Sequence, residues 1–183
     1  MNIWFTADYH LSHANIIKYC NRPFKTLEDM NNTIIRNHNE RIKSEDTLYF
    51  LGDFCFRNSP GGKKGEGEIL RAEYYKKLLN GNIVFIKGNH DANNSLKTHL
   101  DKAIIFYGQK SISLTHRPEH VDTRCDLHFV GHVHQIWKFK RIKQSEHIID
   151  LMNVGVDVWG FKPVSFDEIM RDYHKWKREN KYE

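Results

Sequence analysis

The feature of this sequence that most constrains its fold is a set of five short apolar runs that each lead into Asp, Asn or His. The runs are IWFTA (3–7), TLYFL (47–51), IVFIK (83–87), SISLT (111–115) and LHFVG (127–131). Branched and aromatic residues of this kind are typical of strands. Open α/β sheets bind their ligands at the carboxyl ends of strands. We therefore expect the five strand ends to meet in one crevice.

Further strands are predicted at AIIFY (103–107) and IIDLM (148–152), and helices alternate with the strands. One helix is expected over 27–42, where Thr26 and Asp29 have the spacing of a capping box. Others are expected over 68–79 and 166–180. This alternation predicts an α/β fold of α+β layered type. A length of 183 residues fits a single domain over 1–183.

Two segments stand apart from this pattern. RNSPGGKKGEGE (57–68) contains four glycines and a proline, so it is expected to be a loop. IWKFKRIK (136–143) alternates basic and apolar residues, which predicts an exposed edge strand protected by lysines.

Composition excludes several classes of protein. With 39% hydrophobic and 28% charged residues the chain is not expected to be disordered, and a net charge of +5 favours anionic partners. The three cysteines are odd in number and form no CxxC pair, which argues against a disulfide framework and favours a reduced cytoplasm. Because no export signal or membrane-length apolar run is seen, we expect neither export nor insertion into a membrane.

Histidine is in excess, with 12 residues, which favours metal or acid/base chemistry. Residues two apart in an extended chain project to the same side, so the pairs Asp8/His10 and His132/His134 can each face one crevice. A single histidine here could be structural. Several carboxylates and imidazoles that converge would be costly to desolvate without a cation, so the set together predicts a metal site.

These residues form motifs that resemble the calcineurin-like metallophosphoesterase superfamily, whose pattern is DxH, GDxxDR, GNH[DE], a lone His and GHxH. They are DYH (8–10), GDFCFR (52–57), GNHD (88–91), His116 and GHVH (131–134), in the order of the family. The tract FTADYHLSHANIIKYCNRPF is similar to the small prokaryotic and phage members. The resemblance implies a β-sandwich flanked by helices.

The resemblance also implies a site with two metal ions. One ion would be held by Asp8, His10 and His134, the second by Asn89, His116 and His132, with Asp53 bridging both. It implies that His90 lies beside the substrate and protonates the leaving oxygen or binds the phosphate, with Asp91 as a candidate to orient it. Arg57 matches the arginine of the family and is a candidate phosphate contact. The sequence departs from the pattern at Phe56, where the family has a second Asp.

The mixed imidazole, carboxylate and amide ligands favour Mn, Fe, Zn, Ni or Co over Ca and Mg. Resemblance to the small prokaryotic members favours Mn. The expected activity is hydrolysis of a phosphodiester by a hydroxide that bridges the metals, and an anionic phosphate would balance the charge of such a centre.

The expected substrate is a phosphate ester, including a nucleotide or oligonucleotide held by Lys63, Lys64 and the basic segment 138–143. Neither a membrane nor an obligate protein partner is expected. Three alternatives stay open: a phosphomonoesterase, including a phosphoprotein phosphatase; a nuclease; and a scaffold that binds metal without turnover.

Other polar residues receive weaker predictions. His13 and His120 are candidates to contact a metal ligand or the substrate. Asn153 and Asp157 follow the last predicted strand and either reach the rim of the site or shape a turn. His38, His99, His147 and His174 are expected to face solvent.

Overall fold

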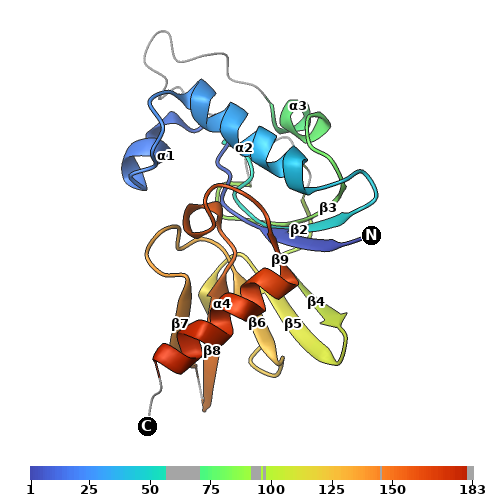
Figure 1. The fold of residues 1–183 in the computed structure, drawn as a ribbon, viewed down its shortest axis with the longest axis vertical. Helices are drawn as coiled ribbons and strands as arrows, with labels where there is room; N and C mark the ends of the chain where they lie inside the picture. Colours follow the sequence, from blue (N-terminus) through green and yellow to red (C-terminus); the bar gives the residue numbers. More distant parts are fainter. Residues whose placement is uncertain (57–70, 92–95, 97, 145, 181–183) are drawn as a thin grey trace.

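The computed structural model describes residues 1–56, 71–91, 96, 98–144 and 146–180, which form two stacked β-sheets flanked by helices (Figure 1). The first sheet has the order β3-β2-β1-β9 and the second the order β4-β5-β6-β8-β7. The strands are β1 (Ile3–Thr6), β2 (Thr47–Leu51), β3 (Asn82–Ile86), β4 (Lys102–Tyr107), β5 (Lys110–Thr115), β6 (Leu127–Val130), β7 (Phe139–Gln144), β8 (His147–Asn153) and β9 (Val164–Ser165). The helices are α1 (Ala14–Tyr19), α2 (Leu27–Arg41), α3 (Ala72–Lys77) and α4 (Phe166–Glu179), with short 3-10 turns η2 (Pro118–His120) and η3 (Val156–Val158). The predicted sandwich flanked by helices is confirmed.

Strand direction explains why the motifs meet. In the first sheet β1, β2 and β3 are parallel neighbours. In the second sheet β5, β6 and β8 are parallel neighbours. The Nδ1 of His116, after β5, lies 2.7 Å from the carbonyl oxygen of Leu51 at the end of β2. The carboxyl ends of both parallel sets therefore lie at a common edge of the sandwich.

The core lies on both sides of the first sheet. Between the sheets, Phe5 packs edge-on against Phe129 with ring centroids 4.9 Å apart. Helix α4 lies across the second sheet (Figure 1), where Tyr173 packs against Phe139 of β7 with ring centroids 5.9 Å apart. On the opposite side of the first sheet, α2 and α3 bury residues that include Met30. Successive side chains of a strand point to opposite faces of its sheet, so β1 and β2 contribute to the core on both faces. Packing on both faces fixes the position of these strands below the site.

Helix ends follow the capping chemistry of the sequence. The Thr26 hydroxyl accepts a hydrogen bond from the Asp29 amide at 3.1 Å, as predicted for the start of α2. Ser165 and Glu168 form a complete capping box at the start of α4. The predicted helix over 68–79 is seen as the shorter α3, and the sequence did not predict α1 or β9. The loop 57–68, with Arg57, Lys63 and Lys64, lies outside the described residues.

Within the basic segment 136–143, residues 139–143 lie in the edge strand β7, as predicted, whereas 136–138 precede it. Two charges of the segment are already paired. Strand β7 pairs only with β8 in the described sheet. Lys138 Nζ lies 2.8 Å from Asp172 Oδ2, and Arg141 Nε lies 2.7 Å from Asp150 Oδ1. These contacts direct Lys138 and Arg141 to α4 and β8. Among the described helices none is long and apolar enough to cross a lipid bilayer.

Candidate metal centre

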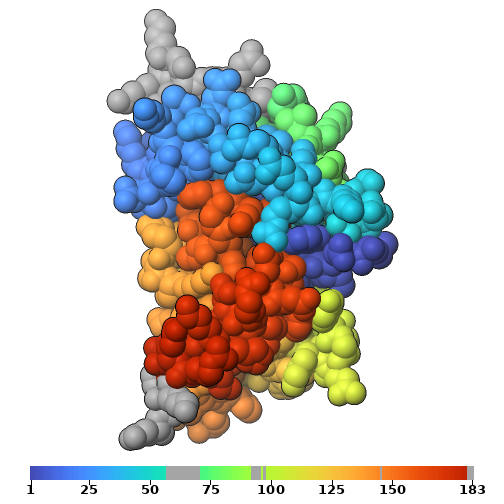
Figure 2. Space-filling model, viewed as in Figure 1, coloured from blue at the N-terminus to red at the C-terminus, as the bar shows by residue number. Residues whose placement is uncertain are grey.

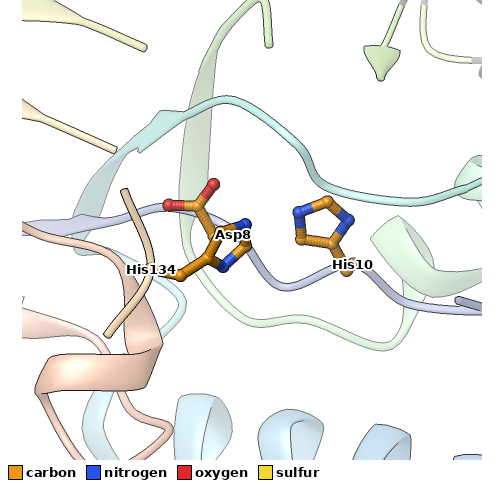
Figure 3. A group of neighbouring side chains, drawn as sticks. All are labelled: Asp8, His10 and His134. Atoms are coloured by element: carbon orange, nitrogen blue, oxygen red, sulfur yellow. The ribbon is translucent and has the colours of Figure 1, made fainter. Parts of the chain in front are cut away.

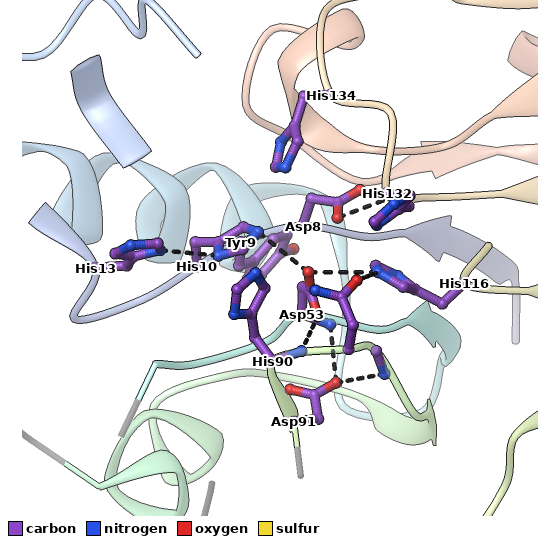
Figure 4. Close-up of polar contacts among 12 residues, drawn as sticks. Asp8, Tyr9, His10, His13, Asp53, His90, Asp91, His116, His132 and His134 are labelled. Atoms are coloured by element: carbon purple, nitrogen blue, oxygen red, sulfur yellow. Dashed lines mark hydrogen bonds and ion pairs between the residues drawn. The ribbon is translucent and has the colours of Figure 1, made fainter. Parts of the chain in front are cut away.

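The strand ends bring the seven predicted ligands into two adjoining groups (Figure 4). In one group Asp8, His10 and His134 each offer a ligand atom, and these atoms lie within 4.8 Å of one another (Figure 3). Asp53, His116 and His132 do the same in the second group. Asn89 Oδ1 joins the second group, 3.0 Å from His116 Nε2. The sequence motifs thus converge, although five different strands carry them.

Asp53 connects the two groups through one carboxylate oxygen. Its Oδ2 lies 3.4 Å from His10 Nε2 in the first group and 3.3 Å from His116 Nε2 in the second. Its Oδ1 accepts a hydrogen bond from the His90 amide at 2.9 Å. One carboxylate oxygen thus faces imidazoles of both groups, which agrees with the prediction that Asp53 bridges two ions.

The donor set fits divalent transition-metal ions. His10 is 1% exposed, and its Nε2 is buried without a hydrogen-bond partner among the described residues. An imidazole nitrogen in this state costs free energy unless a cation accepts its lone pair. Because this nitrogen points toward Asp53, the arrangement fits a metal ligand.

Contacts on the far side of each ring set which nitrogen is available. His116 Nδ1 faces the Leu51 carbonyl, and His134 Nδ1 lies 2.9 Å from Asp157 Oδ2. His10 Nδ1 lies 3.1 Å from His13 Nδ1. Each contact occupies Nδ1 and leaves Nε2 for the centre of the site, as partners of metal-binding histidines commonly do.

Five of the seven ligands have a backbone with positive φ. They are Asp8 (61°), His10 (51°), Asp53 (57°), His132 (71°) and His134 (47°). Residues other than glycine adopt this region at a cost, so the surrounding structure has to impose it. Backbone bonds do so here, since the Asp8 amide donates to Gly52 and the His10 amide to Asp53, both at 3.0 Å. Strain of this kind concentrates at functional sites.

Two glycines allow neighbouring segments of the chain to approach each other closely at the site. Gly52 has φ +87°, and a Cβ there would lie 2.6 Å from His116 Nδ1. A Cβ on Gly88 would overlap Asp53 Oδ1. Glycine is thus required before Asp53 so that His116 of the second sheet can reach the end of β2. Glycine is required before Asn89 so that the chain after β3 can approach Asp53 after β2.

Asp91 ties the two glycine turns together. Its carboxylate accepts hydrogen bonds from the amides of Asp53 and Gly88, both at 2.8 Å, and of Phe54 at 3.1 Å. Burial raises the pKa of Asp91, and these amides oppose that rise. The structure thus gives Asp91 a part in shaping the Asp53 turn. Its predicted role in orienting His90 stays a prediction.

Arg22 is a residue of the site that the sequence did not reveal. Its guanidinium binds Asp157 through Nε at 2.8 Å and Nη2 at 2.9 Å. It also donates to the carbonyl oxygens of Asp8 at 2.7 Å and Tyr9 at 3.0 Å. Arg22 therefore fixes both the backbone of Asp8 and, through Asp157, the ring of His134. The only sequence signal was its place in the tract shared with small prokaryotic and phage proteins.

Segments that are far apart in the sequence meet beside His134. Figure 2 shows the C-terminal part, in orange to red, packed directly against the N-terminal segments in blue. Asn153, which is fully buried, donates to the carbonyl oxygens of His134 at 2.8 Å and Trp137 at 2.9 Å. Asn153 and Asp157 thus support His134 from behind.

A third cluster beside this support does not offer a separate metal site. Cys20, His134 and Asp157 also place ligand atoms within 4.8 Å of one another. Both Asp157 oxygens already accept hydrogen bonds from Arg22. Because this ion pair compensates the carboxylate, we interpret the cluster as part of the packing behind His134.

Comparison with known proteins identifies the family to which this arrangement belongs. Residues 1–118 match the family model for the calcineurin-like phosphoesterase. The chain belongs to the calcineurin-like phosphoesterase family. This membership supports metal-dependent phosphoester hydrolysis at the site described above, and the family implies divalent metal ions.

Relatives of similar length are found in archaea, bacteria and a phage. The chain is 38% identical over 182 residues to uncharacterized protein MJ1445 of Methanocaldococcus jannaschii, covering 96% of this chain and 93% of that protein. It is 25% identical over 203 residues to the gene 66 protein of Mycobacterium phage L5, covering 92% of each. The crystal structure of AQ665, a protein of unknown function from Aquifex aeolicus, has a TM-score of 0.66 and 30% identity over 92% of this chain and 97% of that one.

The departure from the family pattern at Phe56 has a structural counterpart. His13 stacks on Phe56 with ring centroids 4.3 Å apart and an interplanar angle of 13°. His13 is 6% exposed and contacts His10. Phe56 occupies the position where the family pattern has a carboxylate, and it makes an aromatic contact with His13. His13 thus contacts His10, a predicted metal ligand, and a role of His13 at the metal centre stays a prediction.

His90 borders the centre without joining either group of ligand atoms. Its ring centroid is 5.3 Å from that of His10 and 5.2 Å from that of Phe56, and the ring is half-buried. Neither group of three ligand residues includes it. This position agrees with a place beside the substrate.

Replacing His90 with asparagine is expected to lower kcat by about 10²–10⁴-fold, the usual contribution of a general acid. Metal content is expected to stay unchanged. Both are measured on the same preparation, by nitrophenol release and by atomic emission. His174→Asn, on the exposed face of α4, is the control and should alter neither. Loss of metal in the His90 variant would identify its ring as a ligand and contradict this assignment.

Two of the imidazoles hold protons that metal binding has to displace. Burial disfavours the charged form of both rings, but for His116 the bond to Asp53, the charges of Asp8 and Asp53 and the Leu51 carbonyl together outweigh burial and raise the pKa to about 9. For His134 the bonds to Asp157 and Cys20 and the charges of Asp8 and Asp157 together outweigh burial and raise the pKa to about 10. Both rings are therefore charged at pH 7 in the metal-free protein.

We expect metal binding at pH 7 to release about two protons per chain, because these rings must lose a proton before they ligate. Affinity is expected to rise with pH from 6 to 9, since the population of neutral imidazole rises. Calorimetric titration with Mn²⁺ in buffers of different ionisation enthalpy measures the release. A heat that is independent of the buffer would show that both rings are already neutral.

Proposed function

We propose that the protein is a phosphodiesterase that works with two divalent transition-metal ions, Mn²⁺ being favoured, in a reduced cytoplasm. The observation that carries the proposal is the position of Asp53 Oδ2, which lies 3.4 Å from His10 Nε2 and 3.3 Å from His116 Nε2. One shared carboxylate is the usual link between two ions that act together on one phosphate.

Each residue of the site has a proposed role in the reaction. Asp8, His10 and His134 would hold one ion, Asn89, His116 and His132 the other, and Asp53 both. When bound, the pair of ions lowers the pKa of water and stabilises charge on the phosphoryl oxygens. His90 would donate a proton to the leaving oxygen, and Arg57 stays a candidate for a phosphate contact.

Charge supports a diester over a monoester. Two divalent ions with Asp8 and Asp53 leave a net charge of about +2 at the centre. One attacking hydroxide and one diester anion together balance that charge, whereas a monoester dianion exceeds it. A diester also needs help with an alkoxide leaving group, which the half-buried His90 beside the centre would supply.

The test compares two substrates on protein stripped by a chelator and reloaded with Mn²⁺. Nitrophenol release is measured from bis(nitrophenyl) phosphate and from nitrophenyl phosphate, with Asp53→Asn as the blank. Faster turnover of the diester supports the proposal. Faster turnover of the monoester would favour a phosphomonoesterase instead. If the metal-loaded protein cleaves neither, the scaffold alternative gains.

A further inference from the structure

A pocket of about 220 Å³ opens beside the second group of ligands. Asn89 and His116 form one wall, and Lys87, Arg117, His120 and Asp101 form most of the rest. The pocket shares two side chains with the candidate metal centre, so a group bound in it is a direct neighbour of a substrate bound there.

Two backbone features build this pocket. The Lys87 amide donates to the Leu100 carbonyl at 2.7 Å, which brings the segment before β4 beside the end of β3. On the other side, Thr115 Oγ1 and the His120 amide both donate to the Arg117 carbonyl, at 3.0 and 3.1 Å. The basic residues therefore stand on turns that packing fixes at the ends of β3 and β5.

The charge of the lining favours an anion. Among the described lining residues, the cations Lys87 and Arg117 oppose the carboxylate of Asp101, so these three side chains together carry a net charge of +1. Arg117 Nη1 contacts Glu119 Oε1 at 3.3 Å, but the two side chains are 38% and 56% exposed. Such an exposed pair contributes little, so Arg117 can exchange it for a ligand.

The size of the pocket and the chemistry of its lining further restrict the class of ligand that can bind. Sites that enclose a drug-sized ligand measure roughly 300–1,000 Å³, so this pocket holds one group of a larger molecule. Among the described residues that line the pocket, no side chain other than the imidazoles offers an aromatic ring on which a base could stack. A guanidinium and an ammonium together are typical of phosphate recognition.

We propose that this pocket binds a second phosphate of the substrate, next to the one that is cleaved. The substrate is then a nucleotide diester with a neighbouring phosphate at the spacing found in an oligonucleotide. This inference rests on the proposed function for cleavage of the first phosphate, but binding of the second can be tested without turnover.

The first experiment measures binding to the Mn²⁺-loaded protein by calorimetry. The ligands are thymidine 5′-phosphate and thymidine 3′,5′-bisphosphate, which differ by one phosphate. We expect the wild-type protein to bind the bisphosphate about tenfold more tightly, the effect of one charge-assisted contact. Arg117→Gln and Lys87→Gln should each remove most of this preference and leave the affinity for the monophosphate within about twofold.

Lys43→Gln is the matched control, because it removes the same charge as Lys87→Gln. Lys43 is exposed and precedes β2, at the end of the sheet opposite the site. The preference for the bisphosphate should persist in this variant. If Lys43→Gln reduced it as much as Lys87→Gln, the effect would be one of net charge and the pocket assignment would be wrong.

The second experiment uses thymidine 5′-(nitrophenyl phosphate) with and without a 3′-phosphate. The 3′-phosphate should lower KM about tenfold in the wild-type protein and leave kcat unchanged, and Arg117→Gln should abolish the difference. If neither ester is cleaved but the bisphosphate still binds more tightly through Arg117, the proposed function fails and the pocket stands. If the wild-type protein shows no preference in binding, the pocket proposal is overturned whatever the turnover.

Discussion

Asp53→Asn is expected to abolish measurable turnover and to weaken the binding of both metal ions by more than about 100-fold. Loss of a partner that only supports a ligand costs 10–100-fold in metal affinity, and Asp53 is placed to be a ligand itself. The neutral amide removes one negative charge that faces imidazoles of both groups, at 3.4 Å from His10 and 3.3 Å from His116.

The ionisation of Asp53 explains the size of this effect. Burial by itself raises the pKa of this carboxyl, but the hydrogen bond to His116 and the nearby imidazoles outweigh burial and hold the pKa well below its usual range. The carboxylate is therefore charged at every pH at which the protein would work. An amide cannot provide this charge, and its nitrogen cannot ligate.

Metal content per chain and kcat measured on the same sample check this prediction. Asp46→Asn is the matched control, because Asp46 is also 1% exposed and lies before the other end of β2. Its carboxylate accepts hydrogen bonds from the amides of Asn2 and Lys43 and from Trp4 Nε1, so this variant should lose stability but keep both ions. Near-normal activity of Asp53→Asn would contradict the bridging position.

Arg22→Met is expected to lower the free energy of unfolding by about 3–5 kcal/mol in the presence of a chelator. The side chains of Arg22 and Asp157 are 0% and 2% exposed. Removing the guanidinium breaks this buried ion pair, leaves Asp157 with His134 as its remaining partner, and takes the donor from the Asp8 and Tyr9 carbonyl oxygens. Breaking a buried ion pair is among the most costly single changes in a protein. For a chain of this size the midpoint of thermal unfolding should fall by about 10 °C.

The same change should act on one half of the centre. Arg22 holds the Asp8 carbonyl at 2.7 Å and the carboxylate that orients His134. We expect the metal affinity of the group of Asp8, His10 and His134 to fall about 10–100-fold, as it does when other residues that hydrogen-bond to a metal ligand are removed. The group of Asn89, His116 and His132 should keep its ion, so stoichiometry at limiting metal should drop from two to one.

Two further variants separate stability from positioning. In Arg22→Met with Asp157→Leu no buried charge is left unpaired, so part of the stability should return, while metal affinity stays low because His134 has lost Asp157. Arg41→Met removes a partly exposed pair with Glu168, whose side chains are 22% and 26% exposed, and should cost less than about 1 kcal/mol. If the double variant recovered its metal affinity as well, the positioning role would be refuted.

Much of the fold follows from local sequence. Strands such as β2 (Thr47–Leu51) and the start of α2 after Thr26 lie where branched residues and a capping hydroxyl predict them. These signals depend on neighbours within a few residues, so no tertiary information is needed to see them. The two-residue β9 and the six-residue α1 have no such signal and depend on packing.

The contacts behind the ligands could not be predicted in this way. Arg22 and Asp157 are 135 positions apart, and nothing local to either indicates a buried ion pair. His38, expected to face solvent, is fully buried instead, 2.9 Å from the Tyr9 hydroxyl and 2.8 Å from the Asn80 carbonyl. The sequence shows a histidine but not the polar partners that make its burial tolerable.

The sequence by itself determined most of the strands and the capped helices, because these signals are local. Its short motifs named the seven candidate ligands through their resemblance to the family. Only the tertiary structure decided how these residues act together. It placed Asp53 between two groups, imposed positive φ on five ligands, and paired Lys138 and Arg141 with carboxylates instead of leaving them for a substrate. The physical reason is that these features depend on contacts between residues distant in the chain, which form only when the two sheets stack.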